Sequence, residues 1–161
     1  MEKEFVNLIN VHRALIFKVC NIYCYESETR RDLFQEVVLQ LWKSFPSFKR
    51  ESSTTTWIYK VALNTAISNF RKEARRVGKL SISTFETEIP DLSFDPDSID
   101  NNNSIQQAID QLNDLEKAIM MLYLEEKSYE EMSEIVGLST SNIGVRINRI
   151  KKKLTKIIKT Y

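Results

Sequence analysis

Apolar residues recur at helical spacing in the first half of the chain. On a helix over residues 32–45, one side forms a broad apolar face made of Leu33, Phe34, Val37, Val38, Leu41, Trp42 and Phe45. The opposite side carries Asp32, Gln35, Glu36 and Lys43, with Leu39 among them. A single exposed leucine is ordinary on a protein surface. An apolar centre ringed by polar side chains is also typical of a protein-binding patch, and both interpretations stay open.

A second helical pattern begins at Trp57 and runs to Arg76. Its inner face consists of Tyr59, Ala62, Leu63, Ala66, Ile67, Phe70 and Ala74. Its outer stripe has no carboxylate and consists of Trp57, Lys60, Val61, Asn64, Ser68, Arg71 and Arg75. The preceding segment, residues 47–56, supplies Phe48, Lys49, Arg50 and hydroxyl side chains that include Ser52 and Ser53. Aromatic faces, cations and hydroxyls suit unstacked single-stranded bases, although the same residues could simply cap and staple the helix.

Residues 77–103 have no sustained helical period. They contain Pro90 and Pro96 and end in a run of asparagines. We therefore expect an all-α protein with two small helical domains, residues 1–76 and 104–161, joined by a flexible acidic linker. A tether of about 27 residues reaches roughly 90 Å when extended but averages only about 30 Å as a relaxed coil.

The second domain carries helix start and stop signals. Ser104 and Ser128 are each followed three residues later by Gln or Glu, the capping-box spacing, and Asp114 can cap a helix between them. Gly137 stands where a left-handed C-cap is needed, and Ser139 can cap the next helix. This order of signals predicts a helix, a tight turn and a further helix.

The last helix has two contrasting sides. Ile143, Ile147, Ile150 and Leu154 form one apolar stripe, whereas Ser141, Asn142, Val145, Arg149 and Lys152 lie opposite, with Arg146 and Asn148 on the flanks. Amide and guanidinium groups can read base edges, and Lys151 to Lys153 can reach phosphates. The alternative is a solvated, lysine-rich terminal helix. Glycine is unfavourable inside a helix, so we expect Gly144 to be there because the preceding helix packs closely against the last helix at this position.

Composition narrows the class of protein. The chain has 161 residues and 42% hydrophobic content, enough for real cores, while three glycines and three prolines disfavour a turn-dense β fold. No apolar run approaches the roughly 18 residues of a membrane span, and the amino terminus does not resemble a signal peptide, so we expect a soluble cytoplasmic protein.

Cys20 and Cys24 are interpreted as reduced core thiols rather than a redox or metal site, and His12 as a surface or satisfied histidine. We expect no catalytic residue, metal, cofactor or small-molecule substrate.

Charge is distributed unevenly along the chain. The net charge is only +1, yet residues 1–76 hold 13 basic against 8 acidic side chains, and residues 77–110 hold 1 against 7. From Asn142 onward there are 7 basic residues and no acidic one. Basic blocks on both sides of an acidic middle indicate nucleic-acid contact at both ends of the chain, although any one block could be a solvated face.

These segments, in this order, resemble a bacterial RNA polymerase sigma factor of the extracytoplasmic-function type. The resemblance rests on DLFQEVVLQLWKSFPSFK, then TTWIYKVALNTAISNFRK, then LEKAIMMLYLEEKSYEEMSEIVGLSTSNIGVRINRIKKKL. It covers nearly the whole chain outside the linker. It implies that residues 5–76 correspond to the second conserved region of the family and residues 104–159 to the fourth. The implied function is promoter recognition and transcription initiation with core RNA polymerase.

The resemblance also implies roles for particular residues. The helix over residues 32–45 would dock on the β′ clamp helices of the polymerase through Asp32, Gln35, Glu36, Leu39 and Lys43. The loop and second helix would bind the opened −10 element through Phe48, Lys49, Arg50, Ser52, Ser53, Trp57, Lys60, Asn64, Ser68, Arg71 and Arg75. The last helix would enter the major groove at the −35 element through Thr140, Ser141, Asn142, Val145, Arg146, Arg149, Lys152 and Lys153. Its domain would also pack on the β flap.

Three expectations follow from the resemblance. An anti-sigma factor, associated with the inner membrane, that holds this chain inactive until a signal arrives is an expected partner. The linker must extend, because two DNA elements about 20 base pairs apart are roughly 70 Å apart, and in the free protein its acidic charge could instead pair with the basic domains. Primary sigma factors have two adjacent tryptophans where this chain has Trp57 and Ile58, which predicts a narrow promoter repertoire.

An autonomous helix-turn-helix regulator is the alternative function, and an enzyme acting on nucleic acid would need a catalytic cluster that the sequence lacks.

Overall fold

A computed structural model describes residues 1–76 and 107–160, and all regular structure in these ranges is helical. The first domain contains α1 (Glu2–Val11), α2 (Arg13–Tyr23), α3 (Ser27–Ser44), the 3-10 turn η1 (Phe45–Ser47) and α4 (Thr54–Arg76). The second contains α6 (Asp114–Leu124), α7 (Tyr129–Val136) and α8 (Thr140–Thr160), preceded by a helical segment at 107–110. The expected all-α fold is confirmed. The predicted linker and the Ser104 cap lie outside the described residues.

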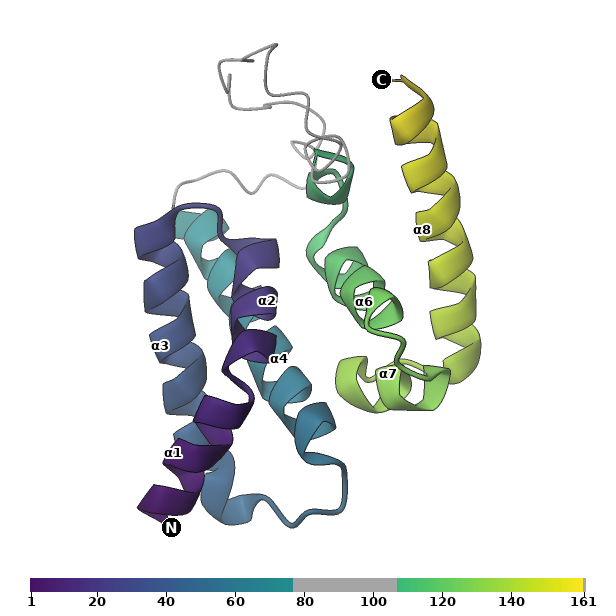
Figure 1. Cartoon of the computed structure of the whole chain (residues 1–161). Helices are drawn as coiled ribbons and strands as arrows, with labels where there is room; N and C mark the ends of the chain where they lie inside the picture. The colour runs from purple at the N-terminus through teal and green to yellow at the C-terminus, as the bar shows by residue number, and fades with distance from the viewer. Residues whose placement is uncertain (77–106, 161) are drawn as a thin grey trace.

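The core of the first domain forms where α2, α3 and α4 pack together (Figure 1). Each helix contributes fully buried aliphatic side chains, among them Ile16, Leu33, Leu41 and Ile58. The predicted helix over residues 32–45 begins five residues earlier, at Ser27, and ends at Ser44. The sequence pattern does not delimit α1 and α2, which meet at His12.

Helix α4 begins at Thr54 rather than at the predicted Trp57. The cause is Ser53, whose Oγ accepts a hydrogen bond from the backbone N–H of Thr56 at 3.2 Å. This bond satisfies a free amide in the first turn, as an N-cap side chain does. The loop before α4 is therefore shorter than the sequence pattern predicts.

Most of the predicted caps of the second domain are present. Ser128 Oγ accepts from the N–H of Glu131 at 3.1 Å, Ser139 Oγ accepts from Asn142 at 3.1 Å, and Gly137 ends α7 with φ +77°. The prediction for α6 is wrong by one residue. Asn113 is the N-cap and forms a reciprocal capping box with Glu116, whereas Asp114 is the first helical residue. Asp114 instead directs one carboxylate oxygen to Arg71.

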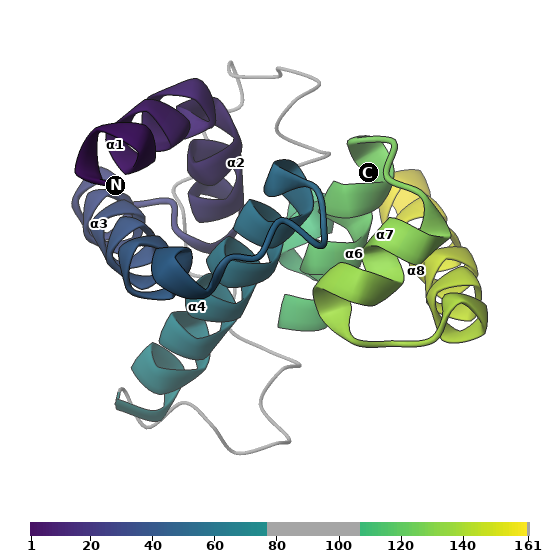
Figure 2. The same cartoon turned by 90° about the horizontal axis from the view of Figure 1, so that it is seen from below.

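Helix α4 lies between the other helices of the first domain and the second domain (Figure 2). It packs against α2 and α3 on one side and against α6 and α7 on the other. Helix α8 packs on α6 and α7 and lies at the outer edge of the molecule. The solvent face of α8 is therefore turned away from the first domain.

Candidate nucleic-acid interface

The polar face of α3 stands open to solvent as predicted. Leu39 is 43% exposed, and Asp32, Gln35, Glu36 and Lys43 around it are also exposed. Trp42, which the sequence pattern places in the core, is 38% exposed. Only part of its ring is covered, by an edge-on contact with Phe5 at 4.9 Å between centroids. Because residues three apart are neighbours on a helix, Leu39 and Trp42 form one exposed apolar patch.

A polar groove of about 620 Å³ runs between α3 and α4. Asp32, Glu36 and Gln40 line it from α3, and Asn64, Thr65, Ser68, Asn69 and Lys72 line it from α4. The groove thus brings two residues of the predicted polymerase patch, Asp32 and Glu36, opposite two residues of the predicted DNA stripe, Asn64 and Ser68. The two predicted surfaces are contiguous.

The two aromatic residues of the predicted single-strand site pack on each other. The rings of Phe48 and Trp57 stack with centroids 4.4 Å apart and planes 19° apart, and Phe45 approaches Trp57 at 6.3 Å. Both Phe48 and Trp57 are half-buried. Each ring therefore has one face occupied within the protein, and a base stacked on this pair would use an outward face.

An ion pair with α1 also holds the loop before α4 in place. Arg50 has a left-handed backbone, φ +56°, and its guanidinium pairs with the Glu4 carboxylate of α1 at 2.7 Å. Lys49 is exposed, and Ser52 is half-buried. Glu4 was not among the predicted site residues, and no local pattern in the sequence connects it to a position 46 residues away.

The outer stripe of α4 presents a row of polar and basic groups. Lys60, Asn64, Ser68 and Arg75 are all exposed. Glu73, the one carboxylate in this part of α4, pairs with Arg76 at 2.5 Å. Arg71 is the exception in the stripe, because its Nε donates to Asp114 of the second domain at 2.6 Å. That hydrogen bond raises the pKa of the Arg71 guanidinium.

Helix α8 confirms the predicted division into two sides. Ile143, Ile147 and Ile150 are buried, while Val145 is 49% exposed. The other exposed members of the predicted DNA set are Thr140, Ser141, Asn142, Arg149, Lys152 and Lys153. Gly144 lies under Tyr129 of α7, whose Cε2 is 3.4 Å from the place a Cβ would take, which confirms the predicted close approach.

Two basic residues of the predicted DNA set on α8, Arg146 and Lys153, make contacts within the protein. The half-buried Arg146 donates from Nε to Asn142 Oδ1 at 2.9 Å, an i, i+4 contact that orients both side chains. Lys153 Nζ pairs with Glu116 of α6 at 3.2 Å. The outward face of α8 is therefore centred on Ser141, Val145, Arg149 and Lys152.

The described residues hold no cluster of three or more His, Cys, Asp or Glu side chains that could bind a metal. Cys20 and Cys24 are free thiols, as predicted, and Cys20 is buried. Burial raises the pKa of the Cys20 thiol to about 12. In the same part of the chain, no helix has the length and apolar composition needed to cross a membrane.

Comparison with known proteins places both helical units in one family. Residues 8–76 match the family model of sigma-70 region 2, and residues 102–154 match that of sigma-70 region 4. The ECF RNA polymerase sigma factor SigW of Bacillus subtilis is 24% identical, with 96% of this chain and 89% of SigW covered. The RNA polymerase sigma factor YlaC of the same organism is 29% identical, with 80% of this chain and 79% of YlaC covered.

A solved structure has the same fold. It is that of the sigma factor RpoE in complex with the anti-sigma factor NepR from Bartonella quintana. The sigma factor chain is 19% identical to this one, and the match covers 98% of both chains with a TM-score of 0.76. A match over 98% of both chains includes both helical units. The two regional matches in family order, the relatives and the shared fold show that this chain belongs to the sigma-70 family, as a sigma factor of the extracytoplasmic-function type.

Proposed function

We propose that this protein is a promoter-specificity subunit that binds core RNA polymerase and directs it to promoters through their −10 and −35 elements. Residues 1–76 would serve as region 2, residues 77–103 as the linker and residues 104–161 as region 4. The observation that carries the proposal is the presence of three exposed surfaces: one on α3, a second beside it on α4 with its loop, and a third on α8. An autonomous helix-turn-helix regulator would need only the third.

The α3 surface is proposed to bind the polymerase clamp helices. Leu39 and Trp42 offer apolar area, and Asp32, Gln35 and Glu36 border it with polar groups. An apolar centre with a polar rim is the usual anatomy of a protein interface. Trp42 joins the predicted set because tryptophan frequently supplies a large share of the binding free energy at such surfaces.

The α4 surface and its loop are proposed to bind the opened non-template strand. Lys60, Asn64, Ser68 and Arg75 are exposed along one stripe, and the Phe48–Trp57 stack closes one end of it. Cations can follow the phosphates, while an outward aromatic face can receive an unstacked base. Arg71 would join this stripe after releasing Asp114.

The α8 surface is proposed to enter the major groove at the −35 element. Its N-terminal half presents Ser141, Asn142, Val145 and Arg149 outward. Guanidinium and amide groups pair with guanine and adenine edges, and an exposed valine can contact a thymine methyl group. Lys152 would bind a phosphate and fix the register.

Catalysis in this scheme belongs to the polymerase. The protein would work in the cytoplasm, where its DNA and polymerase are. An anti-sigma factor is a proposed partner, supported by the fold shared with the sigma factor that was solved in complex with NepR.

Co-purification with core RNA polymerase tests the proposal. Tagged protein is mixed with purified core enzyme and passed over a sizing column, with and without promoter DNA. We expect a stable complex with core enzyme in the absence of DNA. A protein that binds promoter duplex but leaves the core enzyme unbound would instead be a helix-turn-helix regulator.

A further inference from the structure

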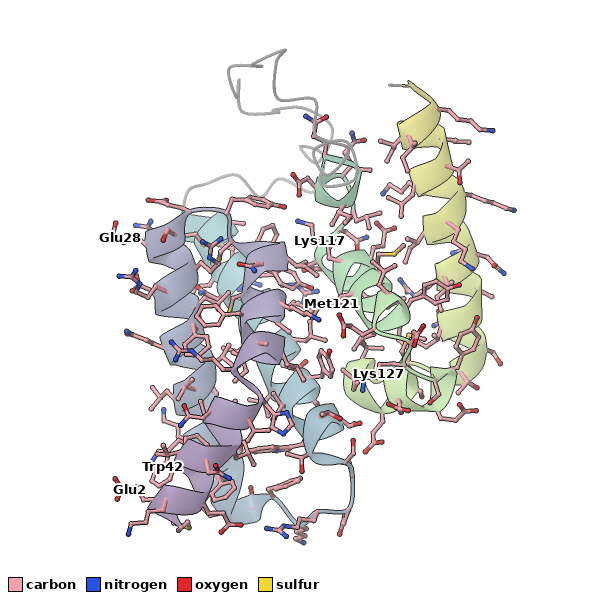
Figure 3. All side chains as sticks on the ribbon, in the orientation of Figure 1. Glu2, Glu28, Trp42, Lys117, Met121 and Lys127 are labelled. Carbon is pink, nitrogen blue, oxygen red and sulfur yellow. The ribbon has the colours of Figure 1, made fainter. Side chains whose placement is uncertain are left out.

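The loop before α4, residues 48–53, lies at the same end of the first domain as the start of α1. In Figure 3, the labelled residues Glu2 and Trp42 mark this end, where α1 and the end of α3 lie next to each other. Phe5 of α1 is only 6% exposed and contacts Trp42 at 4.9 Å and Phe45 at 5.3 Å between ring centroids. Core packing therefore fixes the first turn of α1 beside the loop.

Arg50 in this loop has a backbone conformation that residues with side chains rarely adopt. Its φ of +56° lies in the left-handed region, where the Cβ atom comes close to the following carbonyl oxygen. Such a conformation persists only where its surroundings stabilise it. The Phe48–Trp57 stack holds one end of the loop and the Ser53 cap holds the other, and neither contact involves Arg50. The group that holds Arg50 is the Glu4 carboxylate, which accepts from its Nη2 at 2.7 Å.

This ion pair changes what Arg50 can do at a nucleic-acid surface. A guanidinium without a partner is a mobile cation that binds any phosphate. Pairing with a carboxylate neutralises its charge and restricts the direction of its planar fork. The guanidinium has five N–H donors, and the bond to Glu4 uses one of them. The remaining donors are directed, as recognition of a base edge with two acceptors requires, for example O6 and N7 of guanine.

The position of the pair leaves the guanidinium open to a strand. The Arg50 side chain is 76% exposed and that of Glu4 is 57% exposed. A pair this exposed contributes little to the stability of the domain. Its effect falls on the direction of the Arg50 side chain and on the conformation of the short loop that carries it.

We propose that Glu4 is a positioning residue of the single-strand site, which directs the Arg50 guanidinium toward a base edge and keeps it from binding phosphate. The proposal rests on the proposed function, in which this loop and α4 bind the opened strand. The Glu4 carboxylate also repels phosphates, so the strand passes this end of the loop with its bases toward Arg50. The loop thereby gains selectivity for one base and loses affinity for unselected strands.

The experiment compares variants of both partners with the wild-type protein. Glu4→Ala removes the carboxylate, and Glu4→Asp keeps it one bond closer to the backbone. Glu2→Ala is the matched control, because it removes an exposed carboxylate from the same turn of α1. Arg50→Ala removes the group through which Glu4 acts, and the double variant of Glu4→Ala with Arg50→Ala tests whether the two residues act as a unit. Circular dichroism checks that each variant is helical.

Base selectivity is measured by transcription of a promoter library with a randomised −10 element, using core polymerase and each variant. Glu4→Ala should lower the base preference several-fold at the same −10 position that Arg50→Ala affects, and at no other position. Glu4→Asp should keep most of the preference, Glu2→Ala all of it, and the double variant should match Arg50→Ala alone. Unchanged selectivity in Glu4→Ala, or a loss at a position that Arg50→Ala leaves unchanged, would overturn the proposal.

Affinity for an unselected strand separates positioning from a merely structural role. It is measured with a fluorescent oligothymidylate and the complex of each variant with core polymerase. Glu4→Ala should bind this strand as tightly as the wild-type protein or more tightly, because it lacks a negative charge near the phosphates. Several-fold weaker binding by Glu4→Ala would show that the carboxylate only supports the shape of the site, and the proposal would be wrong.

Limited digestion with trypsin tests the contact without polymerase or DNA. Cleavage after Arg50 requires this side chain to enter the protease, so it must first leave Glu4. Mass spectrometry should find cleavage after Arg50 several-fold faster in Glu4→Ala than in the wild-type protein or Glu2→Ala. Equal rates would overturn the contact. If the wild-type protein directs no transcription with core polymerase, the proposed function fails, while the digestion still decides whether Glu4 holds Arg50.

Discussion

Leu39 and Trp42 are the residues whose exposure is most informative in the first domain. Both are large apolar side chains on α3, three residues apart, and both are more than one-third exposed. A helix of a monomeric domain would ordinarily cover a tryptophan more fully. We propose that a partner surface covers this pair, with Asp32 and Glu36 beside it.

Leu39→Arg tests that explanation. We expect at least a tenfold loss of affinity for core polymerase, since a guanidinium in the apolar centre of an interface would be buried without its water. Fluorescence anisotropy with labelled protein measures the dissociation constant. The matched control is Val6→Arg, which makes the same kind of change at an exposed apolar position of α1 that is 51% exposed. Equal affinities for wild type and Leu39→Arg would remove Leu39 from the interface.

The burial of Cys20 predicts how fast its thiol is alkylated and how the free energy of unfolding depends on pH. Burial raises the pKa of its thiol from 9.0 to about 12. Between these two pH values the folded protein keeps the thiol proton, whereas the unfolded chain has lost it. Alkylation of Cys20 at pH 8.5, followed by mass spectrometry, should be at least 100-fold slower in the folded protein than in urea. The free energy of unfolding should also fall as pH rises from about 9 toward 12, because the unfolded state then binds fewer protons. Rapid alkylation of the folded protein would contradict the burial.

Helix α8 is the element that we propose carries duplex recognition. Arg149→Ala should weaken binding to a −35 duplex by roughly tenfold or more, as expected for loss of a base contact worth about 1–3 kcal/mol. Lys159→Ala, an exposed cation near the end of the same helix, should weaken binding of all duplexes similarly and only slightly. Electrophoretic mobility shifts with matched and scrambled duplexes separate the two effects. Uniform loss across sequences for Arg149→Ala would make Arg149 a phosphate contact.

At the level of elements, the sequence predicts what depends on local rules. The Gly137 C-cap, the Ser128 and Ser139 caps and the apolar stripe of α8 all follow from spacing, and all are present. The start of α4 is predicted three residues late because Ser53 offers a cap that the hydrophobic period does not mark. Asp114 is predicted as a cap, but Asn113 takes that position and Asp114 pairs with Arg71. Local rules cannot foresee that pair, because its partners are 43 positions apart.

In the proposed function, the whole molecule combines a polymerase patch, a single-strand stripe and a duplex-reading helix on two domains. Exposure of the three surfaces supports the site residues that the sequence and its family resemblance predict. The contact between the domains could not be predicted in the same way. Lys117 appears in the sequence as one more helical lysine, and only the packing of α6 against Tyr23 and Phe70 shows that it is buried.

The promoter repertoire is a property of the whole protein. Trp57 is followed by Ile58, which is fully buried in the core, and the Trp57 ring is itself stacked on Phe48. Because Ile58 is buried and one face of the Trp57 ring is occupied, strand opening at this end of α4 should depend on favourable contacts to particular bases. We expect transcription to fall at least tenfold for most single substitutions in the −10 element, measured over a library of promoter variants. Efficient transcription from many divergent −10 sequences would contradict this.

In vitro transcription with purified core RNA polymerase tests the central claim most directly. Core enzyme is incubated with a library of promoter fragments, with and without this protein, and transcript 5′ ends are sequenced. We predict discrete start sites that appear only when the protein is present and that share a −35 and a −10 element at a fixed spacing. If folded protein adds no start sites beyond those of core enzyme alone, the protein is not a promoter-specificity subunit.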